Sequence, residues 1–385
     1  CPVYDLVIKD TDLVVATHGR SFWILDDITQ LHQMQDDLLD ADRHLLKPRD
    51  AVRTPDDLFA GAWDSTGGKN YHVTIGQNST FYLDEAPTGH QTKRVIDGGT
   101  DRTPGVRFTY WLPEGSTGDV TLTIERGSDG AVVETFTSAM PEDEDERRGR
   151  LYLTAEAGMN AFQWPMRHPS GTKIAESSFH GPARGPLALP GGYRATLRVG
   201  EATSTQEFQL LIDPRVTTTP EEFAAQFELL TAIQGKLDDA AAAVNRVTAI
   251  TARLDDWTSR LEAADAAEAG DVGEDDLASS IVAVREQLAA IDAALIQREF
   301  TSDGDSLNHR EQLIEKLGGL PPVVSSADSA PTRQSYQVFE KLSGLIDAQL
   351  AALDAVIQGD LAELNDRLAE LGGRHRDGGL GVVGA

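Results

Sequence analysis

Short apolar runs separated by polar turns open the chain. Residues 13–15 and 22–25 are two runs rich in β-branched and aromatic side chains, and Thr17–Ser21 between them contains Gly19, which suits a hairpin turn. A further apolar run within residues 2–9 precedes them, with a polar turn at 10–12. The pattern predicts three short antiparallel strands in residues 1–30. Because an isolated meander of this size is marginally stable in water, we expect it to need neighbouring β-structure.

Residues 31–105 are predicted to be a connector and a loop-rich β segment, with candidate strands at 69–76 and 79–85. From residue 106 the alternation of apolar and polar positions sharpens, and turn residues separate successive strands without an intervening helix. This spacing over 106–214 favours an antiparallel β-sandwich. The acidic run at 142–146 within it is predicted to be a solvated loop.

The spacing of apolar residues changes at Thr219-Pro220-Glu221-Glu222, from every second residue before it to every third or fourth residue after it. A Thr N-cap, a Pro at the first helical position and acids in the first turn are typical of a helix start. Three amphipathic stripes follow, and together they predict an antiparallel three-helix bundle over 219–372, with a tail at 373–385. The stripes are Phe223, Phe227, Leu230, Ile233, Leu237, Ala241, Val244, Val247 and Leu254; then Leu277, Ile281, Val284, Leu288, Ile291 and Leu295; then Phe339, Leu342, Ile346, Leu350, Leu353, Ile357, Leu361, Leu364, Leu368 and Leu371.

Charge excludes one class of partner. The chain has 62 acidic and 34 basic residues, a formal net charge of −28. Nucleic acid is excluded as a partner because its phosphates would be repelled. The surface resembles that of a salt-adapted protein, and an ordinary acidic extracellular protein is the alternative. No stretch is apolar enough to be a membrane span. The single cysteine, Cys1, allows no intrachain disulfide.

Several stretches resemble one protein family over nearly the whole chain. They resemble the C-terminal part of BNR or Asp-box β-propeller proteins, which are glycosyl hydrolase-like and similar to sialidases and sortilins. No Asp-box, S-x-D-x-G-x-T-W, occurs in this sequence. The resemblance implies the end of a propeller blade, an immunoglobulin- or fibronectin type III-like sandwich, and a propeller that lies upstream. It rests on LVVATHGRSFWILDDI (13–28), LLKPRDAVRT (45–54), GMNAFQWPMRHP (158–169), LALPGGYRATLRVG (187–200), LLIDPRV (210–216), SLNHREQLIEKL (306–317) and SADSAPTRQSYQVFEKLSGLIDAQLAALD (326–354).

Candidate binding residues lie at the first hairpin and its exit. His18 and Arg20 stand at a propeller-type turn, where loops often line a binding face, and Asp26 follows the last strand. The alternative is a turn that hydrogen-bonds its own blade and a solvated exit. No catalytic residue, metal site or cofactor is predicted, because no metal-ligand spacing, nucleophile elbow or phosphate-binding loop occurs.

The resemblance, together with the lack of catalytic motifs, implies a non-catalytic, accessory and structural C-terminal region of a secreted, extracellular or periplasmic propeller protein. Its main partner would be its own upstream β-propeller. The alternative is a carbohydrate- or protein-binding module of the cell surface without hydrolase activity. That alternative needs an exposed aromatic ledge, for which the sequence offers Tyr110, Trp111, Phe162 and Trp164. Sandwich core is the competing prediction for these four residues.

Overall fold

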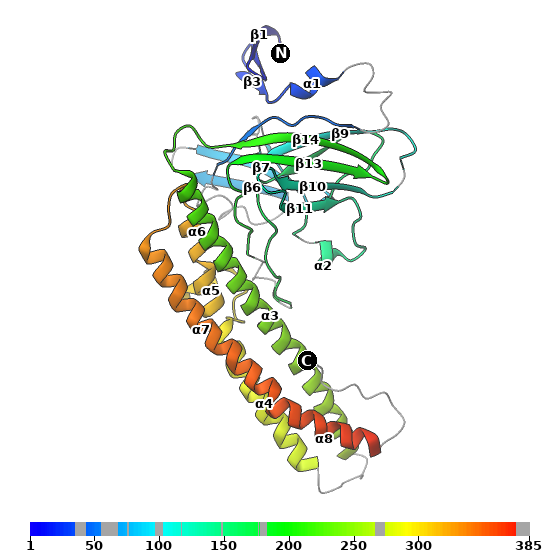
Figure 1. Cartoon of the computed structure of the whole chain (residues 1–385), viewed down its shortest axis with the longest axis vertical. Helices are drawn as coiled ribbons and strands as arrows, with labels where there is room; N and C mark the ends of the chain where they lie inside the picture. The colour runs from blue at the N-terminus through cyan, green and yellow to red at the C-terminus, as the bar shows by residue number, and fades with distance from the viewer. Residues whose placement is uncertain are drawn as a thin grey trace. The chain divides into compact units, whose positions relative to one another are not determined.

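The chain contains both α and β structure and folds into two compact units, as a computed structural model shows (Figure 1). It describes residues 1–34, 44–54, 68–74, 77–96, 103–116, 118–147, 149–175, 177, 183–265 and 274–374. Unit 1 comprises Cys1–Pro169, Pro186–Ala224 and Ser326–Asp328, and unit 2 comprises Ser170–Gly185, Ala225–Ser325 and Ser329–Ala385. The predicted mixed α+β class is confirmed. Among the helices in the described ranges, none has the length and hydrophobicity that crossing a membrane requires.

The three N-terminal strands form a separate antiparallel sheet in unit 1, which we call the N-terminal sheet. β1 (Val3–Lys9), β2 (Asp12–Thr17) and β3 (Phe22–Leu25) are ordered β1-β2-β3, with β2 in the middle. Gly19 has φ of 75° in the β2–β3 turn, a conformation that glycine adopts without a Cβ clash. The three predicted strands are therefore present, and a short helix, α1 (Thr29–Gln33), follows them.

Two further sheets of unit 1 share one hydrophobic core, and we call them the two-sheet body. One has the strand order β11-β10-β13-β14-β5 and the other β12-β9-β4. Alternate side chains point into this core because a strand has a period of two, so Phe108, Leu122 and Trp164 are fully buried. The strands are β4 (His44–Leu45), β5 (Ala51–Val52), β9 (Val106–Leu112), β10 (Val120–Arg126), β11 (Val132–Thr137), β12 (Gly158–Trp164), β13 (Gly191–Val199) and β14 (Ala202–Leu211).

The two-sheet body differs in one respect from the antiparallel arrangement that the sequence predicts. β5 joins β14 in parallel, with Leu210 opposite Ala51 and Leu211 opposite Val52. β4 and β5 come from residues 44–52, within the segment 31–105 that was predicted to be connector and loop-rich β structure. Strands of two residues show no alternation, so hydrophobic periodicity cannot fix their bounds or their partners.

A third sheet of unit 1 consists of β6 (Gly68–Thr74), β7 (Gln77–Glu85) and β8 (Gln91–Val95). β6 and β7 correspond to the two candidate strands of this segment, whereas β8 was not predicted; residues 75–76 lie outside the described residues. The turn between β7 and β8 contacts the two-sheet body, where Tyr152 N–H donates to the Thr88 carbonyl at 2.9 Å. The expected acidic loop contains one helical turn, α2 (Glu144–Arg147).

The helices of unit 2 share a second hydrophobic core. Its long helices are α3 (Pro220–Asp265), which begins in unit 1, α4 (Glu274–Leu295), α7 (Arg333–Gln358) and α8 (Asp360–Arg374). A capping box begins α3, where Thr219 N–H donates to the Glu222 carboxylate at 2.8 Å and Glu222 N–H donates to the Thr219 hydroxyl at 3.3 Å. Shorter elements between α4 and α7 are the 3-10 helix η2 (Asp303–Leu307), α5 (Leu313–Gly318) and α6 (Leu320–Val324).

The third predicted helix is two helices. Its apolar stripe continues from α7 into α8, but Gly359 takes φ of −99° and ψ of −103°, which no α-helical residue adopts. Periodicity alone could not predict this break because the buried residues on both sides keep helical spacing.

Ion pairs join neighbouring long helices. Lys236 of α3 contacts Asp347 of α7 at 2.6 Å, and Arg285 of α4 contacts Asp255 of α3 at 2.7 Å.

Glu134 occupies an inward-facing position of β11, directly opposite the buried Ile124. Burial raises its pKa to about 7 from the usual 4.5. Since the folded state binds this proton more tightly than the unfolded chain, unit 1 should lose stability as pH rises from about 4.5 to about 7. Glu134→Gln should remove this loss and be more stable than the natural chain by about 1–2 kcal/mol above pH ~7, after allowance for partial solvent exposure.

Chemical denaturation of both chains across this pH range measures the difference. Glu207→Gln is the control, because Glu207 lies on the exposed side of β14. A constant gap between Glu134→Gln and the natural chain at every pH would contradict the expected titration.

Surface charge leads to a second prediction. The 62 acidic residues exceed the 34 basic ones by 28 (62 − 34). Their mutual repulsion weakens as salt shortens the screening length to ~3 Å at 1 M. We expect the thermal midpoint of the chain to rise steadily from dilute buffer to about molar salt. Differential scanning calorimetry at a series of salt concentrations tests this. An unchanged midpoint would contradict salt adaptation and favour the alternative, an ordinary acidic protein.

Candidate interaction surface

The N-terminal sheet exposes apolar side chains on both faces. Residues directly opposite each other in a sheet share a face, so the strand register defines two sets. One set, the apolar face, is Leu6, Ile8, Leu13, Val15, Trp23 and Leu25. The other, the mixed face, is Asp5, Val7, Lys9, Asp12, Val14, Ala16, Phe22 and Ile24.

Exposure of these side chains is high. On the apolar face Leu6 is 59% exposed and Trp23 48%, and on the mixed face Phe22 is 75% exposed. Large contiguous apolar patches are uncommon on soluble proteins and mark surfaces that another molecule or segment covers. Covering only one face of this sheet would leave the other in water.

The β2–β3 turn holds this sheet together through local contacts. The Thr17 hydroxyl donates to the Ser21 carbonyl at 2.7 Å, and the Trp23 indole N–H donates to the Arg20 carbonyl at 2.9 Å. Ser21 has φ of 61°, which a small side chain tolerates. The indole is thereby fixed on the apolar face, with its one polar atom satisfied.

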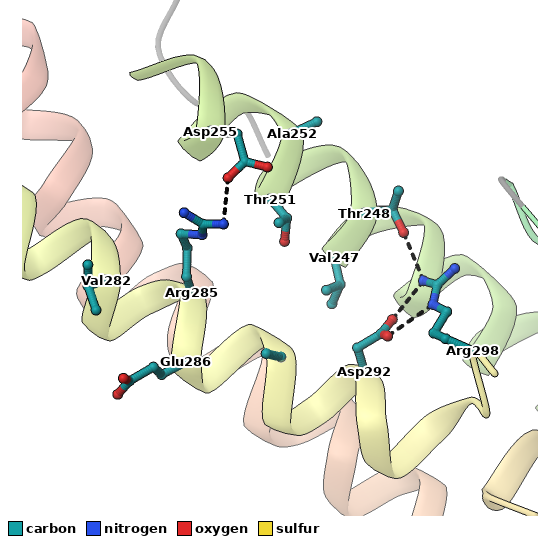
Figure 2. Close-up of a pocket in the computed structure, with 11 residues that line it drawn as sticks. Val247, Thr248, Thr251, Ala252, Asp255, Val282, Arg285, Glu286, Asp292 and Arg298 are labelled. Atoms are coloured by element: carbon teal, nitrogen blue, oxygen red, sulfur yellow. Dashed lines mark hydrogen bonds and ion pairs between the residues drawn. The ribbon is translucent and has the colours of Figure 1, made fainter. Parts of the chain in front are cut away.

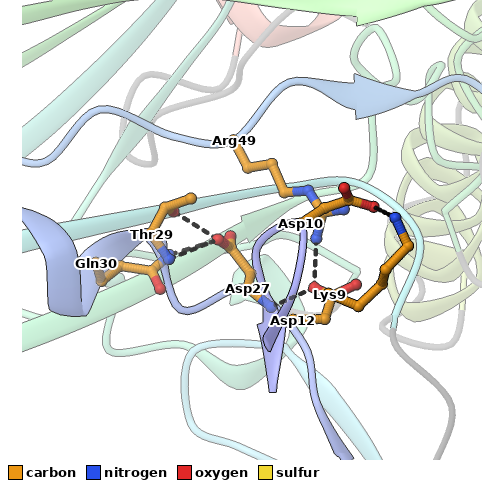
Figure 3. Close-up of polar contacts among 7 residues, drawn as sticks. All are labelled: Lys9, Asp10, Asp12, Asp27, Thr29, Gln30 and Arg49. Atoms are coloured by element: carbon orange, nitrogen blue, oxygen red, sulfur yellow. Dashed lines mark hydrogen bonds and ion pairs between the residues drawn. The ribbon is translucent and has the colours of Figure 1, made fainter. Parts of the chain in front are cut away.

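A polar cluster, which we call the exit joint, connects the N-terminal sheet to the following chain (Figure 3). The Asp12 carboxylate accepts from Asp27 N–H at 2.9 Å and from the Arg49 guanidinium at 2.7 Å. Asp27 has φ of 62° and is nearly buried, and its carboxylate accepts from Thr29 and Gln30. The buried Ile28 donates its N–H to the Thr11 carbonyl at 2.8 Å. These contacts hold β2 to Asp27 and Arg49, and Asp27 to Thr29, which gives the joint a structural role.

The predicted binding residues lie beside this joint but do not converge. His18, Arg20 and Asp26 are all exposed, and among the described residues no hydrogen bond or ion pair joins them. The His18 ring lies 5.3 Å from the Tyr4 ring. Sequence reasoning missed Asp12, Asp27 and Arg49 as a group because Arg49 is 37 residues from Asp12. The signal available was only the Asp-Asp pair at the end of β3.

The aromatic residues considered for a sugar-binding ledge lie mostly in the core. Tyr110, Phe162 and Trp164 are at most 1% exposed, and only Trp111 is partly accessible. The Tyr110 hydroxyl donates to the Thr154 carbonyl at 2.6 Å. Three of the four rings are therefore unable to stack on a sugar.

An open groove of about 730 Å³ lies between α3 and α4 of unit 2 (Figure 2). At one end of the groove Arg285 forms an ion pair with Asp255. At the other end Arg298 forms an ion pair with Asp292 at 2.8 Å and donates a hydrogen bond to the Thr248 hydroxyl at 3.0 Å. Both guanidinium groups are already neutralised by carboxylates, which weakens any attraction for an anionic ligand. In the described parts of the chain no group of three or more His, Cys, Asp or Glu side chains is arranged to hold a metal ion.

Comparison with known proteins gives no match to any family model, to curated proteins or to solved structures.

Removing the N-terminal sheet tests whether it is a surface in its own right. Deleting residues 1–26 should raise the solubility of the chain, because seven large side chains of the two faces are more than two-fifths exposed: Leu6, Val7, Ile8, Phe22, Trp23, Ile24 and Leu25. The two-sheet body should keep its thermal midpoint, since its core contains no residue of the deleted segment. Precipitation assays and calorimetry measure the two effects. Loss of the body's unfolding transition would mean that the strands belong to its fold.

Proposed function

We propose that this chain is a non-catalytic accessory and structural region of a secreted BNR-repeat, glycosyl hydrolase-like propeller protein, similar to sialidases and sortilins. The observation that carries the proposal is the N-terminal sheet, whose apolar face and mixed face both expose large apolar side chains. In this role the sheet is the end of a propeller blade, and the propeller is its main partner. The protein acts outside the cytoplasm, extracellularly or in the periplasm.

The pattern of the faces favours a blade over other kinds of sheet. A sheet of a sandwich has one inward apolar face and one solvated face, so its strands alternate between apolar and polar residues. Blades of a propeller stand around a central channel, so each has a neighbour on both sides. Leu6 and Val7 illustrate the second pattern, because these consecutive residues point to opposite faces and both are apolar.

The other parts of the chain have supporting roles. The two-sheet body is an immunoglobulin- or fibronectin type III-like sandwich that braces the propeller. The exit joint connects them, since Arg49 precedes β5 of the body and binds Asp12 of the N-terminal sheet. The helices of unit 2 mediate contacts within or between chains. The alternative, a carbohydrate-binding module, has less support because its aromatic ledge would need Tyr110, Phe162 and Trp164, which are buried.

Two experiments test the proposal. The gene upstream of this region should encode repeated Asp-box sequences, and the propeller they encode, produced separately, should bind the 385-residue chain in a pull-down. Substituting Trp23→Lys on the apolar face should abolish binding, whereas Arg126→Lys, on the two-sheet body, should not. The proposal is overturned if no propeller is encoded there, or if the purified chain itself hydrolyses aryl glycosides or sialosides.

A further inference from the structure

The two edges of the N-terminal sheet differ in how well they are protected. β1 has a register irregularity between Val3 and Asp5, and it carries Asp5 and Lys9. Bulges and charges are the devices by which natural proteins prevent edge strands from pairing with other chains. β3, at the other edge, is the uncharged sequence Phe-Trp-Ile-Leu with neither bulge nor proline. Among the described strands only β2 pairs with it.

Hydrogen bonding determines which backbone groups of β3 point to its open edge. Thr17 N–H donates to the Ser21 carbonyl at 3.3 Å, so these two residues form a hydrogen-bonded pair of the β2–β3 ladder. Such pairs alternate along an antiparallel ladder, which turns Trp23 and Leu25 toward β2. The N–H and C=O groups of Phe22 and Ile24 therefore point away from the sheet.

We propose that β3 pairs with β3 of a second copy of this chain, antiparallel and centred on Ile24. In this register Ile24 lies opposite the Ile24 of the second copy, and its outward N–H and C=O make both bonds of a hydrogen-bonded pair. Trp23 lies opposite the second copy's Leu25. A two-fold axis perpendicular to the sheet keeps each face on its own side, so one six-stranded sheet results, with a continuous apolar face.

Charge favours a second copy at this edge. Two chains of net charge −28 repel each other over most of their surfaces, but β3 itself carries no charge. In the register centred on Ile24, the end of β3 that leads to Asp26 lies beside the start of the second copy's β3, which follows the turn that carries Arg20. The two-fold symmetry therefore brings the exposed, oppositely charged Arg20 and Asp26 of the two copies to the same ends of the shared pairing, where they attract each other.

This inference goes beyond the proposed function, because it uses an edge of the sheet and leaves both faces uncovered. The test is sedimentation equilibrium of the full chain in about 1 M salt, where the screening length is ~3 Å. The average mass should rise with protein concentration from 41.6 kDa toward twice that value. A mass that stays at 41.6 kDa at every concentration would overturn the proposal, without bearing on whether the faces bind a propeller.

Three variants locate the contact. Ile24→Pro removes only an outward N–H, which edge strands tolerate, and should keep the chain at 41.6 kDa. Ile24→Lys places like charges directly opposite each other and should have the same effect even if the proline variant misfolds. Val7→Lys is the matched control, because Val7 is on the same face, in the same row and equally exposed at 59%, but on the β1 edge. It should still dimerise. Equal loss of the dimer in Val7→Lys and Ile24→Lys would assign the contact to the face and overturn the edge pairing.

Discussion

Asp328→Ala should lower the free energy of unfolding of unit 1 by about 3–5 kcal/mol, because it leaves the buried Arg53 charge without its partner. The two side chains form an ion pair and are 5% and 2% exposed. Arg53 also donates from Nε to the Ala188 carbonyl at 3.0 Å, and its guanidinium lies 5.0 Å from the centre of the Phe223 ring. None of these contacts replaces the lost negative charge.

Replacing both charges separates the electrostatic cost from packing. In Arg53→Met with Asp328→Leu no buried charge remains, so most of the lost stability should return. Glu125→Ala is the control: the Glu125 carboxylate lies 3.9 Å from the Arg194 guanidinium in a partly exposed pair, and its loss should cost about 0–1 kcal/mol. Urea denaturation followed by circular dichroism measures all three. If the single and the double replacement destabilise equally, the side chains contribute packing rather than charge.

The Arg53–Asp328 ion pair could not be predicted from the sequence. Arg53 and Asp328 are 275 residues apart, and neither has a neighbour that signals burial or pairing. Local patterns predict which residues are helical or extended, but they contain no information about which distant side chains meet. The same limit applies to Asp12 and Arg49 in the exit joint.

Elements with a strong period were predicted well. Leu277, Ile281 and Val284 recur at helical spacing, and all three are about 1% exposed in α4. The Thr219 helix start is confirmed by its capping box with Glu222. The N-terminal strands were predicted as well, although their alternation fails, because apolar side chains on both faces still have high strand propensity.

For the candidate surface the sequence predicted the strands but not the residues that matter. His18, Arg20 and Asp26 attracted attention as polar residues near a turn, yet they are exposed and separate. The apolar face and the mixed face follow only from the register, in which Leu6 lies opposite Val15 and Val15 opposite Trp23. A shift of one residue would exchange the faces, and sequence alone does not fix that register.

The buried stripe of α4 can be tested at its centre. Leu288 is fully buried in the core of unit 2, between Val284 and Ile291 along the same stripe. Leu288→Ala removes three buried carbon atoms and leaves a cavity that close-packed neighbours fill only partly. We expect it to lower the free energy of unfolding of unit 2 by about 2–5 kcal/mol.

Glu286→Lys on the same helix is the matched control, because Glu286 is exposed at the edge of the α3–α4 groove. Reversing an exposed charge should change the free energy of unfolding by no more than ~0.5 kcal/mol. Chemical denaturation of the full chain, followed by helical circular dichroism, compares the two variants at one salt concentration so that the net charge of −28 is equally screened. If the two substitutions cost the same, then the face of α4 that carries Leu288 is not the one packed against α7 and α8, and the core of unit 2 is assembled differently.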